Sequence, residues 1–392
     1  MRNFSFACLI AALCTSAAIA ETPTPSSNLE ASGATAPVAY VYVSSNPANS
    51  STNEIHAYAA SAEGKLTPIV GSPFADDVTS MAVNGKYLFG SNRNGIYVAA
   101  FAIASDGAPR WTNSTDIVQF NADDCGSTGP LFLDHTGATL YDTEFRSDCA
   151  NNSYQSLAVN KTTGKLRNLG SSSTDEWLYL PASFIGNNVY AYSAGCVEDL
   201  YWEINGYKRS STGALSRINI SAPTPTPKSG DFFCPSQTAA DPTNHVAITL
   251  QPVNNQQFTP DGPAQLASYT ADNAGNLHTA STLANMPSAA VGTVTDLKMG
   301  PGGKLLAVAG TAGLQVFHFN GANPITADTG LLTKIEIDQM FWDNDHHLYA
   351  ISQSAGKIFV FTVTETSATQ APGSPYTLAG PQNIAVQPKT KL

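Results

Sequence analysis

The chain has 392 residues, a formal net charge of −11 and only 12% charged residues. An acidic protein of this kind repels phosphate backbones, which excludes nucleic-acid binding as its main role. The charged fraction is about half of that usual in cytosolic globular proteins, and Ser, Thr, Asn and Gln take its place, as is typical of exported proteins.

Residues 1–20 predict a secretory signal peptide. Arg2 provides a positive start, a mostly apolar run begins at Phe4, and Ala18-Ile19-Ala20 forms a cleavage site of the A-x-A kind. The apolar run is too short and too rich in Ala, Ser and Thr to be a stable membrane span. We therefore expect cleavage after Ala20, a secreted or periplasmic location, and no transmembrane segment in the mature protein.

Residues 21–37 are rich in Thr, Pro, Ser and Ala. They cannot bury enough apolar surface to fold, so we expect a flexible leader. The remaining residues, 38–392, are expected to form a single domain of repeated strands. Pairs such as Asn-Gly and Asp-Gly punctuate this region at the spacing of strands, and helical periodicity is nearly absent from it.

A four-strand unit recurs seven times at intervals of roughly 40–50 residues, which is typical of the blades of a β-propeller. The clearest copies begin at Gly292 and at Asp338. Each copy reads as a short first strand, a turn with Asp, Asn or Gly, a second strand, a loop, a third strand and a weaker fourth strand. The predicted first strands begin near Thr79, Gly129, Pro181, Gln237, Thr295, Asp338 and Gln382.

The two ends of this region are out of step by one strand. The region starts on a second strand, Tyr40-Val-Tyr-Val-Ser-Ser, and finishes on a first strand, Gln382-Asn-Ile-Ala-Val-Gln-Pro. We expect the last strand to pair beside the strand of Tyr40 and to supply the missing innermost strand of blade one, which leaves only short, protected edges. The predicted fold is an all-β, seven-bladed propeller with four-stranded antiparallel blades, closed by its C-terminal strand.

Four cysteines remain after the signal peptide, and they allow three disulfide pairings. Cys125 precedes the first strand of blade three, and Cys149 lies in the loop between the second and third strands of that blade. Cys196 and Cys234 occupy the equivalent loops of blades four and five, and both kinds of loop meet at one rim. We predict the disulfides Cys125–Cys149 and Cys196–Cys234, each worth roughly 3 kcal/mol. The alternative is a zinc site, which needs close Cys-x-x-Cys pairs that are missing here.

The common catalytic motifs are absent. The sequence has no Gly-x-Ser-x-Gly elbow, no His-Glu-x-x-His and no phosphate-binding Gly-Lys-Ser/Thr loop. His346-His347 lies in a turn between a first and a second strand, on the rim opposite the cysteines. A metal-binding pair is one interpretation of these histidines, and a solvated turn is the favoured one. No metal site is predicted.

The rim that carries the cysteines also carries most candidate binding residues, because loops held on a rigid ring are where propellers usually bind ligands. Glu144, Arg146 and Asp123 are the candidate catalytic residues, since a carboxylate beside a guanidinium can orient a polar ligand. A surface ion pair is the favoured alternative for them. The further candidates for binding are Arg93, Asp124, Glu176 and Trp177.

Trp177 and the carboxylates of the cysteine-bearing rim each have two interpretations. Trp177 is a candidate stacking platform for a sugar ring, and packing between blades explains it equally well. The rim carboxylates suit Ca²⁺, which takes six to eight oxygen ligands, but no Asp-x-Asp-x-Asp run supplies them locally. We expect no other cofactor.

Several phrases resemble the lactonase-type, or 6-phosphogluconolactonase-like, family of seven-bladed propellers with its YVTN-like repeats. Glu63-Gly-Lys-Leu-Thr-Pro-Ile-Val-Gly-Ser-Pro-Phe matches the phrase of that family, and parts of it recur at Thr163-Gly-Lys-Leu and Gly373-Ser-Pro-Tyr. The resemblance spans about residues 38–388. It implies the propeller fold and, for the enzymatic members, the opening of sugar lactones or related chemistry.

The enzymatic members carry a Pro-His-x-His segment on a first strand and an Asp-Leu-Gly-x-Asp phrase after the second strand. The corresponding positions of blade three read Gly129-Pro-Leu-Phe-Leu-Asp-His and Tyr141-Asp-Thr-Glu-Phe-Arg, so no catalytic residue is transferred. The favoured function is therefore a ligand-binding or interaction module, expected to be monomeric. Its partner would be a small molecule, a carbohydrate or an extracytoplasmic protein. The alternative is a hydrolase or isomerase of sugar-derived lactones or other small cyclic esters.

Overall fold

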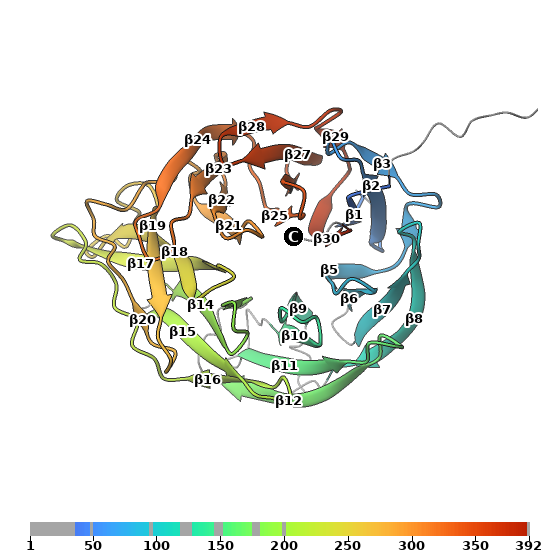
Figure 1. Cartoon of the computed structure of the whole chain (residues 1–392), viewed down its shortest axis with the longest axis horizontal. Coiled ribbons are helices and arrows are strands. Elements are labelled where there is room, and N and C mark those ends of the chain that lie inside the picture. Colours follow the sequence, from blue (N-terminus) through green and yellow to red (C-terminus); the bar gives the residue numbers. More distant parts are fainter. Residues whose placement is uncertain are drawn as a thin grey trace, which may run out of the picture. The chain divides into compact units, whose positions relative to one another are not determined.

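The computed structural model describes residues 36–47, 50–93, 97–117, 128–144, 152–174, 181–197 and 201–389. Within these ranges the chain forms strands and no α-helix, and the strands make seven antiparallel sheets. Figure 1 shows the sheets arranged one after another around a central axis. The prediction of an all-β, seven-bladed propeller is confirmed. No helix capable of crossing a bilayer occurs in these ranges.

The strands of the first four blades have the following bounds. Blade one contains β1 (Ala39–Ser45), β2 (Glu54–Ala60), β3 (Leu66–Pro68), β4 (Phe74–Ala75) and β30 (Pro381–Pro388). Blade two contains β5 (Val78–Val83), β6 (Tyr87–Asn92), β7 (Tyr97–Ile103) and β8 (Pro109–Asp116). Blade three contains β9 (Thr128–Leu133), β10 (Thr139–Glu144), β11 (Asn152–Val159) and β12 (Leu166–Thr174). Blade four contains β13 (Ser183–Phe184), β14 (Tyr190–Val197), β15 (Tyr201–Arg209) and β16 (Leu215–Ile218).

The last three blades continue the same order. Blade five contains β17 (Asp231–Ala240), β18 (His245–Asn254), β19 (Gln265–Ala271) and β20 (Leu277–His278). Blade six contains β21 (Val294–Met299), β22 (Leu305–Gly310), β23 (Gly313–His318) and β24 (Thr326–Thr333). Blade seven contains β25 (Gln339–Trp342), β26 (His347–Ser352), β27 (Lys357–Thr364), β28 (Ser367–Gln370) and β29 (Tyr376–Thr377).

The ring is closed by pairing between β30 and β1. The two strands are antiparallel, with Val41 opposite Val386 and Val43 opposite Ile384. β30 is thus the innermost strand of blade one, as the sequence predicts, and Figure 1 shows it beside β1 at the centre of the ring. Because the last strand completes the first blade, the two ends of the described chain hold each other in place.

The second strands are buried on both faces, because each sheet is packed between two neighbouring sheets. All seven residues of β1 are buried. Its alternate side chains belong to different cores. Tyr40 and Tyr42 pack with residues of blade two, whereas Val41 and Val43 pack with residues of blade seven. The period of two along a strand therefore produces a separate apolar layer at each seam between blades.

Polar side chains on the first strands link neighbouring blades around the axis, and we call them the first-strand girdle. Asn383 Oδ1 accepts a hydrogen bond from Met81 N at 2.9 Å, and Ser80 Oγ accepts one from Leu131 N at 2.9 Å. Asp296 Oδ2 accepts a 2.8 Å bond from Met340 N, and Gln339 Oε1 accepts a 3.2 Å bond from Ile384 N. The innermost strands are too far apart to form a continuous sheet, so these side chains satisfy backbone groups that would otherwise lack a partner.

Each of six seams is closed by a contact between a side chain and a glycine. The side chain begins a second strand, and the glycine lies in the turn between the third and fourth strands of the next blade. A Cβ at Gly107 would lie 2.5 Å from Tyr40, and one at Gly275 would lie 2.8 Å from Tyr190. Both glycines also have positive φ, so no other residue fits. The six pairs are Tyr40–Gly107, Tyr87–Gly164, Thr139–Gly213, Tyr190–Gly275, His245–Gly321 and His347–Gly64.

The predicted strand order holds throughout, but blade five has a longer first hairpin than expected. β17 begins at Asp231 rather than near Gln237, and β17 and β18 each have ten residues. Cys234 therefore lies within β17, and Cys196 lies within β14, so neither lies in the predicted loop. The predicted boundary was wrong, because the strand begins before Pro235 and passes it with a shift of register between Pro235 and Thr238.

Candidate functional site

Two rims of the ring follow from the strand order. The first strands begin, and the second strands end, at the rim that we call the cysteine rim. The opposite rim, which we call the turn rim, is formed by the turns between first and second strands and between third and fourth strands. Because all neighbouring strands within a blade are antiparallel, each kind of loop occurs at one rim only.

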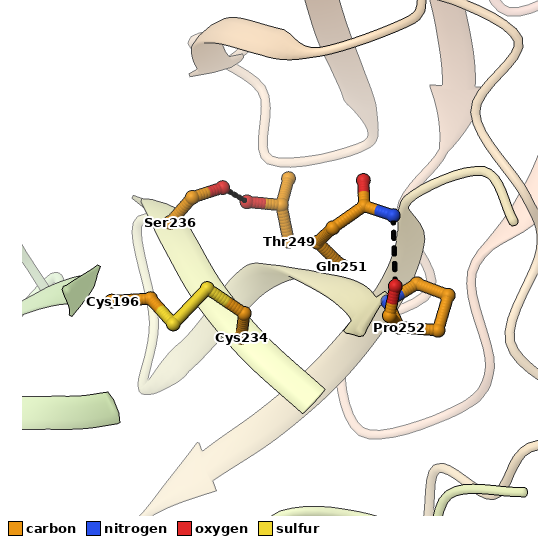
Figure 2. Close-up of a disulfide and its surroundings, with 6 residues drawn as sticks. All are labelled: Cys196, Cys234, Ser236, Thr249, Gln251 and Pro252. Atoms are coloured by element: carbon orange, nitrogen blue, oxygen red, sulfur yellow. Dashed lines mark hydrogen bonds between the residues drawn. A yellow bond between two sulfur atoms is a disulfide. The ribbon is translucent and has the colours of Figure 1, made fainter. Parts of the chain in front are cut away.

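The disulfide Cys196–Cys234 marks the cysteine rim between blades four and five. Its Cα atoms are 5.4 Å apart, and it joins β14 to β17. Figure 2 shows it beside the hairpin of β17 and β18, where Ser236 Oγ and Thr249 Oγ1 lie 2.8 Å apart. This pairing confirms the prediction. The second predicted pair, Cys125 and Cys149, lies outside the described residues.

Most of the residues predicted to form a site on the cysteine rim also lie outside the described residues. This is true of Arg146, Trp177, Asp123, Asp124 and Glu176. Glu144 is the last residue of β10, and its side chain is not among those described. The juxtaposition of Glu144 with Arg146 therefore stays a prediction. The same holds for Ca²⁺ binding by the rim carboxylates.

Arg93 is the predicted binding residue that the structure describes. It lies directly after β6 on the cysteine rim and is exposed. Its guanidinium donates from Nη1 to the carbonyl oxygen of Ser51 at 3.0 Å. Its backbone N donates to the carbonyl oxygen of Asp77 at 3.0 Å. Arg93 thus joins the loop of blade one to the start of blade two, and part of its donor capacity is used there.

Asp76, a neighbour of these contacts, has an unusual environment for a carboxyl group. Partial burial and the charge of Asp77 raise the pKa of Asp76 to about 6. The carboxylate of Asp77 is engaged differently, because its Oδ1 accepts a 2.9 Å hydrogen bond from Asn53 N. Burial, together with Asp76 and Asp77, also raises the pKa of Tyr97. The sequence shows two adjacent Asp residues but cannot distinguish their environments, because burial depends on the folded loops.

A cavity of about 350 Å³ lies along the axis at the turn-rim ends of the first strands. Six blades contribute to it, and most of the lining consists of the last residues of their first strands. Apolar side chains such as Met81, Leu131 and Phe341 form part of the wall. The polar lining residues are His135, Ser183, Gln237, Thr238 and Lys298. We call this space the channel cavity.

Lys298 is held in the wall of the channel cavity by Asp296. Its Nζ lies 2.8 Å from Asp296 Oδ1, and the Asp296 carboxylate is almost fully buried. Asp296 also accepts hydrogen bonds from Leu297 N and Met340 N. The two backbone donors fix the carboxylate, which in turn fixes the direction of the lysine. Nothing in the sequence singles out Lys298, because a lysine on a strand normally indicates a solvated face.

The turn rim differs from expectation at the pair His346-His347. His346 is exposed, in agreement with a solvated turn, but His347 is fully buried, and that part of the interpretation was wrong. His347 Nδ1 lies 2.8 Å from Asp343 Oδ2, which also accepts a 2.8 Å hydrogen bond from Tyr349 OH. The ring is buried because it closes the seam against Gly64 of blade one. Among the described residues, no group of three or more His, Cys, Asp or Glu side chains is arranged to hold a metal ion.

The sequence matches no family model, and it matches no curated protein. Several solved structures are similar to it. A periplasmic gluconolactonase from Pseudomonas aeruginosa is 14% identical, with a TM-score of 0.61 over 89% of this chain and 98% of that one. A protein from Bacteroides uniformis, provisionally described as a 6-phosphogluconolactonase, is 13% identical, with a TM-score of 0.63 over 89% and 99%. Its counterpart from Bacteroides fragilis is 12% identical, with a TM-score of 0.61 over 89% and 97%.

These similarities extend over nearly the whole ring. Identities of 12–14% show the fold alone and assign no activity to this chain. The resemblance noted in the repeat phrases agrees with them. The chain therefore has a seven-bladed propeller scaffold like that of the lactonase-type proteins.

Proposed function

We propose that the protein is an exported β-propeller that binds a small, hydroxyl-rich ligand, a carbohydrate or a carbohydrate derivative, in its channel cavity. The observation that carries this proposal is the fixed position of Lys298 in the wall of a cavity of about 350 Å³. Cavities of about 300–1,000 Å³ with a few oriented polar groups are typical of small-molecule sites.

The chemistry of the wall suits a ligand with several hydroxyl groups. An ammonium group has three donors, and Asp296 takes one of those of Lys298. Gln237 adds an amide group on the next blade. Ser183 and Thr238 donate their hydroxyl protons within the protein, to Thr238 O and Tyr192 O at 2.8 Å, so they can offer a ligand only acceptor oxygens. Apolar surface from Met81, Leu131 and Phe341 lies between these groups, as required to pack against the C–H face of a sugar ring. Each hydrogen bond to a charged donor is worth about 1.5–3 kcal/mol.

Export is part of the proposal. The signal-peptide pattern of residues 1–20 supports it, and so does the disulfide Cys196–Cys234, because such bonds persist mainly outside the reducing cytosol. One similar structure is a periplasmic protein by its own description.

The proposal is tested by a titration of the mature protein with D-glucose, D-gluconate and D-glucono-1,5-lactone, measured by calorimetry and by thermal shift. A ligand that binds the folded state raises the melting temperature. Lys298→Met is expected to weaken binding at least tenfold, because it removes the charged donor. Lys228→Met is the matched control, since Lys228 forms an exposed ion pair with Asp261 away from the cavity. Equal binding by the two variants, or no binding of any of the three compounds, would refute the proposal.

The alternative is a lactone hydrolase with its site on the cysteine rim. One observation favours it: a carboxyl group with a pKa of about 6, as in Asp76, can act as a general base near neutral pH. Glu144, Arg146 and Asp123 are the further candidates for this site. Turnover of D-glucono-1,5-lactone above the uncatalysed rate, lost in Asp76→Asn but retained in Lys298→Met, would establish this alternative in place of a pure binding role.

A further inference from the structure

The seam between blades six and seven lacks the contact that closes the other six seams. The residue at the start of β22 is Leu305, where the equivalent positions carry tyrosine, histidine or threonine. The facing turn of blade seven reads Thr364-Glu365-Thr366 and contains no glycine. The next inward position of β22 is Ala307, whereas β1, β10, β14 and β26 have a tyrosine there. The two side chains that β22 contributes here are therefore small or short, and they pack with Trp342 and Phe361. Ala247 of β18 is equally small, but that seam is closed by His245 against Gly321.

The consequence is a pocket of about 370 Å³, which we call the six–seven pocket. It shares no lining residue with the channel cavity. Its apolar part is formed by Trp342, Leu305 and Pro301, and its edge by Glu365 and His346. Gly302 lies at the border, and a Cβ built on it would meet no atom within 4 Å.

The polar residues of the pocket include Lys304 and Glu365 at its edge and the buried Asp343, whose Oδ2 accepts a hydrogen bond from Tyr349 OH. Lys304 Nζ and Glu365 Oε1 lie 3.0 Å apart across the seam, and both side chains are more than half exposed. The indole of Trp342 is 5% exposed, and its Nε1 donates to the carbonyl oxygen of Lys298 at 3.2 Å. Since that bond uses the only donor of the indole, the ring offers apolar surface to the pocket.

The closed seams indicate which chemical group fits this space. In three of them the tyrosine at the start of the second strand packs its ring on the turn glycine, and its hydroxyl donates to a carbonyl oxygen of the same turn. Tyr40 donates to Ser105 at 2.6 Å, and Tyr190 donates to Asn273 at 3.0 Å. Tyr87 donates to Thr162 at 2.5 Å. A planar ring with a hydroxyl donor is thus the group that this fold accommodates between neighbouring blades.

We propose that the six–seven pocket is a binding site for a small phenol-like molecule, that is, a planar aromatic ring bearing a hydroxyl donor. The ring takes the place that a tyrosine ring occupies in other seams and packs against Trp342 and Leu305. The hydroxyl reaches the turn of blade seven, where Glu365 and Thr364 supply acceptors. Aromatic pairs add about 0.5–1.5 kcal/mol beyond the burial of their area, which favours a planar ring over a saturated one. This site is independent of the channel cavity and of the proposed function.

The probe is p-cresol, which reproduces the tyrosine side chain, and 4-methylcyclohexanol is its saturated counterpart. Binding to the mature protein is measured by saturation-transfer NMR and by titration. Gly302→Phe and Leu305→Tyr each add a ring at a residue that lines the pocket. Gly170→Phe is the matched control, because Gly170 lies on β12 and a Cβ there also meets no atom within 4 Å.

The expected result is saturable binding of p-cresol by the unchanged protein and by Gly170→Phe, weakened at least tenfold in Gly302→Phe and Leu305→Tyr. 4-Methylcyclohexanol should bind at least tenfold more weakly than p-cresol. Should Leu305→Tyr fail to fold, Gly302→Phe decides, since its side chain enters open space. The proposal is overturned if p-cresol does not saturate, if folded Gly302→Phe binds it unchanged, or if the saturated analogue binds equally well.

Discussion

Single residues in this propeller acquire their roles from the neighbouring blade. Gly64 and Gly164 belong to the repeated Gly-Lys-Leu phrases, and the structure explains the repetition, because each must accept a ring of the preceding blade, His347 and Tyr87 respectively. His347 illustrates the converse case. A histidine in a polar turn reads as solvated, yet Asp343 and Gly64 give it a buried site at a seam. Neither role can be deduced from the local sequence alone.

Asp76 gives a prediction about pH at the residue scale. Its pKa is raised from 3.8 to about 6 in the folded protein, so the folded state binds more protons than the unfolded state between these values. The free energy of unfolding should therefore fall as the pH rises through this window. After allowance for solvent screening of a half-exposed group, the loss is about 1 kcal/mol.

The measurement is urea unfolding of the protein and of Asp76→Asn at pH 4 and pH 7. The variant should be more stable than the unchanged protein at pH 7 by about 1 kcal/mol, and the difference should shrink at pH 4. Asp116→Asn, an exposed site on β8, is the control and should show no such dependence. If the difference in free energy of unfolding between the two proteins is the same at both pH values, the pKa of Asp76 is not raised in the folded state.

At the scale of strands, blade five departs from the expected repeat in its first hairpin. Its first hairpin, β17 and β18, is longer than expected and is fastened to β14 by Cys196–Cys234. Lys228 and Asp261 form an ion pair beside the same hairpin. The disulfide thus ties the first part of β17 to the end of β14.

Loss of this disulfide should destabilise the protein. The bond closes a loop with a sequence separation of 38, for which chain entropy predicts a stabilisation of about 3–4 kcal/mol. The double variant Cys196→Ala/Cys234→Ala should reach half-unfolding at a correspondingly lower urea concentration under non-reducing conditions. Peptide mapping of the unchanged protein must recover the linked pair. An unaltered midpoint in the double variant would show that the bond does not stabilise the fold.

For the whole ring, closure depends on one strand and on the first-strand girdle. Asn383 contributes to both, because its Oδ1 accepts from Met81 N and its Nδ2 donates to Gln339 Oε1 at 2.9 Å. It thus connects blade one to blade two on one side and to blade seven on the other. Blades two to seven need no such closing contact, since each of them is formed by consecutive strands of the chain.

Asn383→Ala should lower the free energy of unfolding by about 2 kcal/mol, because it leaves partly buried groups on both neighbouring blades without a partner. Hydrogen exchange should also increase at the amide of Met81. Asn255→Ala, at an exposed position in the loop after β18, is the control. If Asn383→Ala and Asn255→Ala have the same free energy of unfolding, the first-strand girdle does not contribute to closure of the ring.

The repeat, the count of seven blades and the closure by β30 could be predicted from the sequence, because strand periodicity and the offset between the two chain ends are local properties that survive in a single chain. The pairing Cys196–Cys234 could be predicted for the same reason, once the strand order was known. Only the tertiary structure decided that Lys298 lines a cavity, that Asp76 has a raised pKa, that His347 is buried and that one seam is open. Burial and side-chain direction at these positions depend on the neighbouring blade, which lies some 40–50 residues away in the sequence, a distance over which periodicity carries no information about contacts.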